Sequence, residues 1–324
     1  MPLGQATDVG AMVIGGGKHK FAAHRIDVSV AQEADVAKTH SLYSVRLLQP
    51  DDSSSDHLDP SDFLMTNNKS NFGRCALTGS YGKFVKCHIL PQAFTRPEIK
   101  GLPLFQSSRG KGELRRWSSW YDKRLVTREG EDFLSDIDDA AIKTLRRYQL
   151  VWSSWAVFRP HFEKISPAWP HHGYRKIKIS DVSTIIRFAL SVAWRASASS
   201  LPDMAQAKLD SEQEDRLKDF VLGEPILGAS PFPVSLTQIS TVGTIHNQSP
   251  GVDEKRIFNL EGSEDKFVKI VRIYLDGLIL HVHLSHTHHD HVQGNPIFLG
   301  SSDHVFITSV TYEASYQYEN MLHL

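Results

Sequence analysis

The chain has 324 residues, of which 40% are hydrophobic and 23% are charged, and its formal net charge at pH 7 is −1. This composition indicates a globular protein that is long enough for two or more packed units. The near-neutral charge excludes nucleic-acid binding through overall charge, so a basic surface has to be local. The two cysteines, Cys75 and Cys87, exclude a disulfide scaffold and a self-contained four-cysteine zinc site, and they fit a reducing compartment.

Residues 1–70 are expected to form an irregular N-terminal region. Their segment Asp51–Ser61, DDSSSDHLDPS, has the composition of turns and linkers. Residues 1–20 lack the basic and the long apolar parts of a secretion signal. No apolar run reaches the roughly 18 residues of a membrane span. These features favour a cytoplasmic protein without a membrane partner.

The first organised unit is expected at residues 71–150. Its run Lys83–Leu90, KFVKCHIL, has the β-branched and aromatic content of a strand between turn residues. We predict a hairpin that ends at His88, because Pro91 cannot donate a ladder hydrogen bond just beyond it. Residues 96–128 are expected to be a basic loop.

Three helices are predicted. The first spans Glu131–Arg147, with apolar residues at helical spacing, acids in its first turns and arginines at its end, as the helix dipole favours. The second spans Asp181–Ser197 and is apolar nearly all round, so we expect it to be buried with its Arg195 paired in the interior. The third spans Ser211–Leu222, and its first residue forms a capping-box pattern with Glu214.

The rest of the chain is expected to divide into a helical section, residues 151–230, and a β-rich section, residues 231–324. Strands are predicted within Val268–His283, around an Asp-Gly turn, and at Val305–Val310. The sequence therefore predicts an α+β fold.

One stretch carries an ordered set of motifs. It begins with Cys75 and a turn, continues with a strand that ends in His88-Ile-Leu-Pro, and leads through a basic loop into an acid-led helix. This order resembles the HNH (ββα-metal) endonuclease family, in the branch whose strand ends in a His-Ile-Ile-Pro-like tetrapeptide. The resemblance covers residues 74–147. It implies a ββα-metal core and metal-dependent hydrolysis of nucleic-acid phosphodiesters, with DNA as the expected partner.

The resemblance also implies roles for particular residues. His88 would be the general base, since a neutral imidazole can take a proton from water near neutral pH. Asp122 or Arg124 would orient His88, and both remain candidates. Glu131 stands at a position that often ligates the metal, and Asp132 is its neighbour. Oxygen ligands imply a single Mg²⁺ or Mn²⁺.

The sequence departs from the family at two places. Many members hold a structural zinc on two Cys-x-x-Cys pairs. In this chain Cys75 keeps one of the four cysteine positions, and the other three are occupied by Thr78, Thr127 and Gly130. No structural zinc is therefore expected. Cys87 is the remaining candidate metal ligand, and it stands where many active members have an acid. This second departure keeps open a non-catalytic descendant that binds nucleic acid or a protein partner.

The segment between Lys83 and Arg128 is locally basic, with eleven Lys and Arg residues against three acids. Cations can neutralise phosphates and aromatic rings can stack on bases, so the segment predicts a nucleic-acid-binding surface. The candidate residues are Lys83, Lys86, Arg96, Arg109, Lys111, Arg115, Arg116, Trp117, Trp120 and Tyr121.

A second motif lies in HVHLSHTHHDH, residues 281–291. The spacing of His286, His288, Asp290 and His291 is similar to the metal-binding motif of metallo-β-lactamase-fold hydrolases, and an apolar strand precedes it as in that family. That fold needs a further His and Asp well downstream, and only 33 residues follow His291. A metal-dependent hydrolase at these residues is therefore kept as an alternative to the nuclease, beside a loop that binds metal without catalysis.

Overall fold

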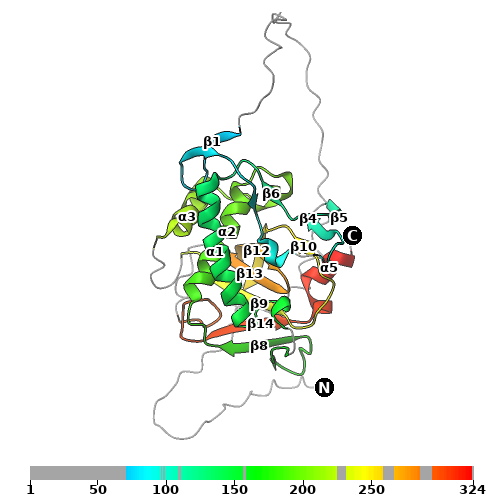
Figure 1. The fold of residues 1–324 in the computed structure, drawn as a ribbon. Helices are drawn as coiled ribbons and strands as arrows, with labels where there is room; N and C mark the ends of the chain where they lie inside the picture. Colours follow the sequence, from blue (N-terminus) through cyan, green and yellow to red (C-terminus); the bar gives the residue numbers. More distant parts are fainter. Residues whose placement is uncertain are drawn as a thin grey trace, which may run out of the picture.

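The computed structural model describes residues 71–95, 97, 99–108, 111–155, 158–224, 231–257, 266–284 and 294–322. The expected irregular region, residues 1–70, lies outside them. The described residues form a mixed α+β fold, which confirms the predicted fold class. The long helices lie together on one side of a large sheet (Figure 1). None of the helices in these ranges is both long and apolar enough to cross a membrane.

The large sheet has seven strands in the order β11-β12-β13-β9-β14-β8-β7. Strand β14 runs parallel to β9, and the other neighbours are antiparallel. The strands are β7 (Glu163–Lys164), β8 (His172–Ile177), β9 (Val234–Ile239), β11 (Gly251–Ile257), β12 (Lys266–Leu275), β13 (Leu278–His283) and β14 (Val305–Val310).

Three of these strands confirm the sequence prediction. Strands β12 and β13 are joined by Asp276 and Gly277, whose φ angles of 47° and 80° are those of a type I′ hairpin turn. Strand β14 has the predicted bounds. The section expected to be helical, residues 151–230, also supplies β7 and β8. Their residues are mostly polar and half-exposed, so no apolar alternation marked them.

The helices are α1 (Arg128–Arg147), α2 (Val182–Ala198), α3 (Ser211–Leu222) and α5 (Tyr316–Leu322), with short 3₁₀ turns at η4 (Gln92–Phe94), η5 (Trp152–Ser154), η6 (Pro202–Ala207) and η7 (Tyr312–Ala314). The three predicted helices are confirmed within three residues. The predicted capping box is wrong: Asp210 caps α3 by accepting a 2.8 Å bond from the Gln213 N–H. The Glu214 carboxylate instead accepts from the Ser197 hydroxyl at 2.5 Å.

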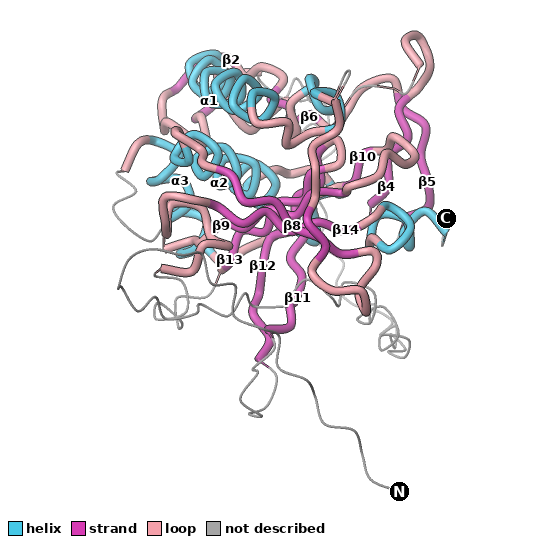
Figure 2. The backbone as a smooth tube through the Cα atoms, turned by 90° about the horizontal axis from the view of Figure 1, so that it is seen from below, coloured by secondary structure: helices cyan, strands magenta, loops and turns pink. Residues whose placement is uncertain are grey.

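Helix α2 lies between α1 and the sheet (Figure 2). Nearly all of its second half is buried, which confirms the prediction from its all-round apolar surface. Residues from α1, α2, α3 and one face of the sheet form a single continuous hydrophobic core. A smaller cluster around Trp152 and Tyr312 packs on the opposite face of the sheet.

Three small β-units complete the fold. Strand β1 (Phe72–Arg74) pairs with β2 (Tyr81–Lys83), and β3 (Cys87–His88) pairs with β6 (Tyr121–Asp122). Strand β4 (Leu104–Ser108) lies between β5 (Lys111–Arg116) and β10 (Asn247–Gln248). The expectation of a loop over residues 96–128 is therefore wrong. The strand β5 is rich in charged residues and has no apolar alternation that would have predicted it.

Candidate functional site

His88 lies at the end of a two-stranded unit that leads directly into α1. In the pairing of β3 with β6, Cys87 lies opposite Asp122 and His88 opposite Tyr121. The ladder continues with a 3.0 Å bond from the Ile89 N–H to the Trp120 carbonyl. Helix α1 starts at Arg128, soon after β6. Two short antiparallel strands and a helix thus place the His88 side chain at the rim of this unit.

The His88 ring is half-buried, and its polar contact is with Gln92. The Gln92 amide nitrogen lies 2.9 Å from His88 Nε2. With the amide as donor, Nε2 accepts, and the ring proton is assigned to Nδ1. Burial lowers the pKa of His88, and the positive charges of Arg195 and Lys86 lower it further. The ring is therefore neutral near pH 7, as a general base has to be.

Arg195 fixes the backbone of His88 from the interior. Its guanidinium donates to the His88 carbonyl at 2.9 Å and to both oxygens of Asp138, at 3.0 and 2.7 Å. The Arg195 side chain is 2% exposed and that of Asp138 is 15% exposed. This contact joins α2, α1 and the end of β3. It confirms that Arg195 is paired in the interior.

The side chains of Cys87 and Glu131 lie beside each other. Cys87 is fully buried, and the charge of the neighbouring Glu131 carboxyl acts on its thiol. Burial raises the pKa of Cys87 well above its usual value, and the nearby Glu131 charge raises it further. Burial also raises the pKa of Glu131. Cys87 is therefore a protonated thiol near neutral pH, which makes it a poor metal ligand.

The expected orienting and neighbouring residues lie elsewhere. The Asp122 carboxylate accepts from the Arg124 N–H at 2.8 Å and from the backbone and side chain of Ser200 at 2.8 and 3.0 Å. Burial alone would raise its pKa, but these hydrogen bonds lower it. Asp122 thus ties β6 to the end of α2, and the Arg124 side chain is exposed. Asp132 is also exposed and lies 3.7 Å from Arg128 rather than facing Cys87.

The chain brings together positions 75, 78, 127 and 130, which the resemblance described above matches to zinc-ligand positions. The Thr78 N–H lies 3.4 Å from Cys75 Sγ, and the Thr127 N–H also bonds this sulfur. A Cβ atom at Gly130 would lie only 2.6 Å from the same sulfur. The pairs 75/78 and 127/130 therefore meet around Cys75, although about fifty residues separate them in sequence.

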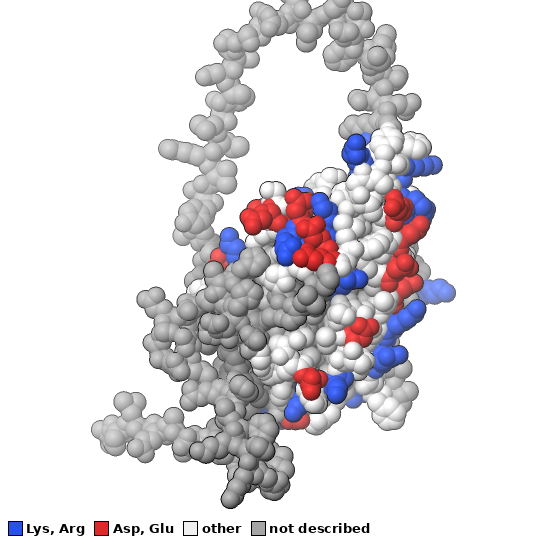
Figure 3. Space-filling model, turned by 90° about the vertical axis from the view of Figure 1, so that its left-hand side faces the viewer, with Lys and Arg blue, Asp and Glu red and all other residues white. Residues whose placement is uncertain are grey.

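Basic and aromatic side chains surround His88 on the outside. The Tyr121 ring centroid lies 5.9 Å from that of His88. The Nζ atoms of Lys86 and Lys123 lie 4.9 and 5.8 Å from the Tyr121 ring. On the part of the surface visible in Figure 3, acidic and basic side chains are interspersed, with no large area of one sign.

The other candidate contact residues are spread over neighbouring elements. Trp117 is 78% exposed, and the Arg115 guanidinium lies 5.2 Å from the Phe105 ring on the β4–β5 hairpin. Trp120 is 6% exposed and belongs to the hydrophobic core, so it cannot stack on a base, which corrects the prediction. Lys83, Lys111 and Arg116 lie on β2 and β5. Arg96 and Arg109 lie outside the described residues.

The alternative metal motif cannot be placed in the same way, because His286, His288, Asp290 and His291 lie outside the described residues. The strand that was predicted to precede it is present as β13. His281 and His283 on β13 are buried, and burial lowers the pKa of His283 to about 3. These two histidines are therefore neutral near pH 7. Within the described ranges, no three His, Cys, Asp or Glu side chains gather closely enough to hold a metal ion.

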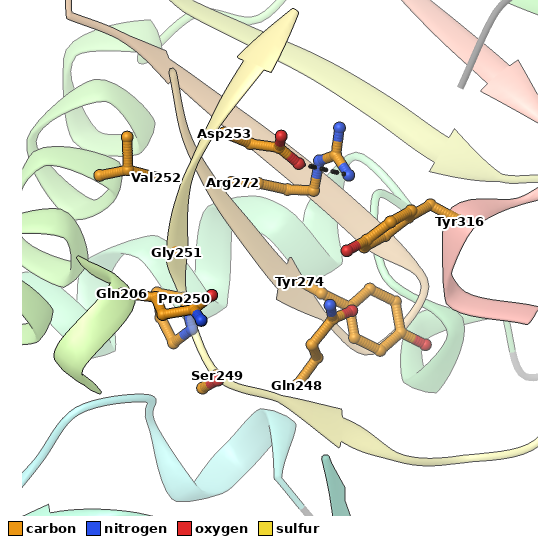
Figure 4. A pocket seen from close by; sticks show the side chains of 10 residues that line it. All are labelled: Gln206, Gln248, Ser249, Pro250, Gly251, Val252, Asp253, Arg272, Tyr274 and Tyr316. Carbon is orange, nitrogen blue, oxygen red and sulfur yellow. Dashed lines mark ion pairs between the residues drawn. The ribbon is translucent and has the colours of Figure 1, made fainter. Parts of the chain in front are cut away.

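A separate polar pocket lies between η6, β10, β11, β12 and α5 (Figure 4). The Arg272 guanidinium is 3.2 Å from the Asp253 carboxylate and lies 4.4 Å over the Tyr316 ring. Because this ion pair neutralises the charge of the pocket, it offers no net attraction to phosphate. None of the residues predicted from the sequence lines it.

Sequence reasoning missed Gln92. It stands four residues after His88, directly after Pro91. A polar side chain this close in sequence to the end of the strand is the signal that could have predicted a contact with His88. The chain was also compared with family models, curated proteins and solved structures, and none of the three comparisons gave a significant match.

Proposed function

We propose that this chain is an HNH-type endonuclease that hydrolyses nucleic-acid phosphodiester bonds with His88 as the general base. The observation that carries the proposal is the placement of a neutral, rim-located His88 beside an outer cluster of Lys86, Tyr121 and Lys123. A general base and a phosphate-attracting surface are two of the features that hydrolysis of a phosphodiester requires.

The convergence of positions 75, 78, 127 and 130 supports the family resemblance independently. A β-turn with Cys75 lies against the start of α1, as the resemblance implies for the zinc-holding part of the core. The order β3, β6, α1 supports a ββα unit in the same way.

His88 would take a proton from water through Nε2. Gln92 donates to the lone pair of this atom and so keeps the ring proton on Nδ1, and its amide would have to give way to the attacking water. Arg195 would hold the His88 backbone at the strand end. The lysines beside Tyr121 would hold the phosphate backbone near the ring.

A Mg²⁺ or Mn²⁺ ion would be held by Glu131 alone among the candidate ligands. Its Oε2 is buried and has no hydrogen-bond partner among the described residues, whereas Cys87 is a protonated thiol and Asp132 faces solvent. Such an ion commonly binds through one or two carboxylates, with water and substrate phosphate as its other ligands. When bound, it would stabilise charge on the phosphate and the leaving oxygen.

Replacing His88 by alanine is expected to lower the rate of plasmid cleavage about 10²–10⁴-fold, because the general base is lost. Cleavage is measured with supercoiled plasmid DNA in Mg²⁺ or Mn²⁺. His172→Ala is the matched control, since His172 is also half-buried and its pKa is also lowered by burial. Equal losses in the two variants would contradict a catalytic role for His88.

A binding protein without nuclease activity is the second candidate. It is favoured by the protonated Cys87 thiol and by the commitment of Asp138 to Arg195, which leave few ligands for a metal. Wild-type protein that binds DNA without cutting it would support this candidate. Hydrolysis of a small ester or lactam that is lost in His288→Ala would instead support the metal-dependent hydrolase.

Replacing Lys86 by glutamine is expected to raise the pKa of His88 toward its usual value, because Lys86 is one of the positive charges that lower it. The neutral form of His88 would then be lost at a higher pH, and the acidic limb of the cleavage profile would move up with it. The pKa is measured by an NMR titration of the ring protons. Lys143→Gln, an exposed change on α1, is the control and should leave this pKa unchanged.

A further inference from the structure

The outer face of the β1–β2 hairpin carries two aromatic and two basic side chains. Phe72 lies opposite Lys83, and Arg74 lies opposite Tyr81. These four residues are exposed, while the glycines between them are not, so the four share one face of the hairpin.

The exposure of the two aromatic rings is large. Phe72 is 51% exposed and Tyr81 is 72% exposed, although rings of this size contribute strongly to a core when they are buried. The packing of the opposite face of the hairpin explains why the two rings point outward. There the Cα of Gly73 lies against the Phe84 ring and that of Gly82 against Thr127, so the hairpin packs closely on the segment before α1. Figures 1 and 2 both place the hairpin at one end of α1.

The charge of this segment is of one sign. No acidic residue occurs in residues 63–97, whereas Arg74, Lys83 and Lys86 are basic. A partner for this face therefore has negative charge. Phe72 and Tyr81 are diagonal neighbours, and such residues lie about 7–8 Å apart in an antiparallel pair. Two exposed rings at this spacing favour a partner that also has flat apolar surfaces.

Unpaired nucleotides combine these two properties. Each has a phosphate for a cation and a base with a flat face for an aromatic ring, and base stacking of this kind tolerates any sequence. Bases inside a duplex are already stacked and do not offer their faces. An acidic peptide would match the cations but not the two rings.

The hairpin is also continuous with the proposed site. Three residues separate β2 from β3, and the last of them is Lys86, which lies over Tyr121 beside His88. A strand that stacks on the hairpin can thus reach the lysines and ring around His88 along one connected segment.

We propose that the outer face of the β1–β2 hairpin is a stacking platform for single-stranded nucleic acid, with Phe72 and Tyr81 contacting bases and Arg74 and Lys83 contacting phosphates. The proposal rests on the proposed action on nucleic acid and names the form of that substrate: DNA or RNA with unpaired bases next to the cleaved bond.

Binding is measured by fluorescence anisotropy with a labelled single-stranded DNA of about 16 nucleotides, near the upper site size of compact single-strand-binding folds. EDTA is present so that binding is separated from cleavage. Tyr81→Ala and Phe72→Ala are each expected to weaken binding about five- to 150-fold, the loss of one stacked base. Arg74→Gln and Lys83→Gln should each reduce the slope of log affinity against log salt by about 0.7.

Phe158→Ala is the matched control, because Phe158 is 76% exposed and lies outside the hairpin. It should leave the affinity unchanged. A strand of the same length without bases should bind Tyr81→Ala and wild type equally, since no stacking is lost. Circular dichroism and thermal melting check that the exposed substitutions leave the fold intact.

Unchanged affinity in both aromatic variants would overturn the platform, as would an equal loss with the base-free strand or in Phe158→Ala. Wild-type protein that binds no single strand but still cuts duplex plasmid would overturn the platform and leave the nuclease standing. Tight, Tyr81-dependent binding without any cleavage would support the platform and count against the nuclease.

Discussion

Replacing Arg195 by leucine is expected to lower the free energy of unfolding by about 3–5 kcal/mol, because it leaves the Asp138 carboxylate and the His88 carbonyl without their buried partner. The cost comes from an uncompensated charge in a low-dielectric site rather than from the loss of attraction alone. Both oxygens of Asp138 accept from the same guanidinium, and no other donor to Asp138 among the described residues would replace it. Unfolding in urea gives the free energy directly.

The double variant Arg195→Leu with Asp138→Leu separates these two contributions. With both charges removed, stability should recover most of the loss, since apolar replacements of a buried pair are often neutral or stabilising. Arg216→Leu is the control, because the pair that it breaks with Glu224 is exposed and is expected to contribute less than about 1 kcal/mol. A loss in Arg195→Leu no larger than that of this control would mean that Arg195 does not hold the site together.

Arg195 also shows which features of the site the sequence could predict and which it could not. The apolar pattern of α2 predicted that this arginine is paired inside, and the structure confirms it. The partner could not be predicted, because Asp138 and His88 lie 57 and 107 residues away in the chain. The Gln92 contact, by contrast, spans four residues and was open to prediction.

The fold likewise has elements that local sequence predicts and long-range contacts that it does not. Helices α1, α2 and α3 were predictable because their apolar spacing is a local property of the chain. The β12–β13 hairpin was predictable from its Asp-Gly turn. The assembly of the sheet was not, since β8 joins β14 across a long stretch of sequence and its mostly polar, half-exposed residues carry no alternation. Strand β5 was missed for a similar reason.

Introducing cysteines at positions 78, 127 and 130 is expected to create a zinc site with Cys75. The backbone already brings these four positions together, and N–H groups of Thr78 and Thr127 already bond the Cys75 sulfur. Four thiolates in such an arrangement bind Zn²⁺ tetrahedrally. Because the folded state alone presents the site, zinc should stabilise the variant by about 4 kcal/mol when free zinc is a thousand times its dissociation constant.

The substitution at Gly130 has a cost in the absence of metal. A Cβ atom there would lie 2.6 Å from Cys75 Sγ, so the sulfur has to move away before zinc can draw both residues to the metal. We therefore expect the metal-free triple variant to melt at a lower temperature than wild type and the zinc-loaded form at a higher one.

Zinc content by mass spectrometry and thermal melting with and without a chelator measure the two effects. The triple serine variant is the control, because it has similar side-chain size but lacks the thiolates. One zinc ion per chain with chelator-sensitive stability would establish that positions 75, 78, 127 and 130 share the geometry of an HNH zinc site. That geometry would support the family assignment without reference to catalysis. A triple cysteine variant that binds no zinc would remove the strongest independent support for the resemblance, and the proposed nuclease would then rest on His88 and its neighbours alone.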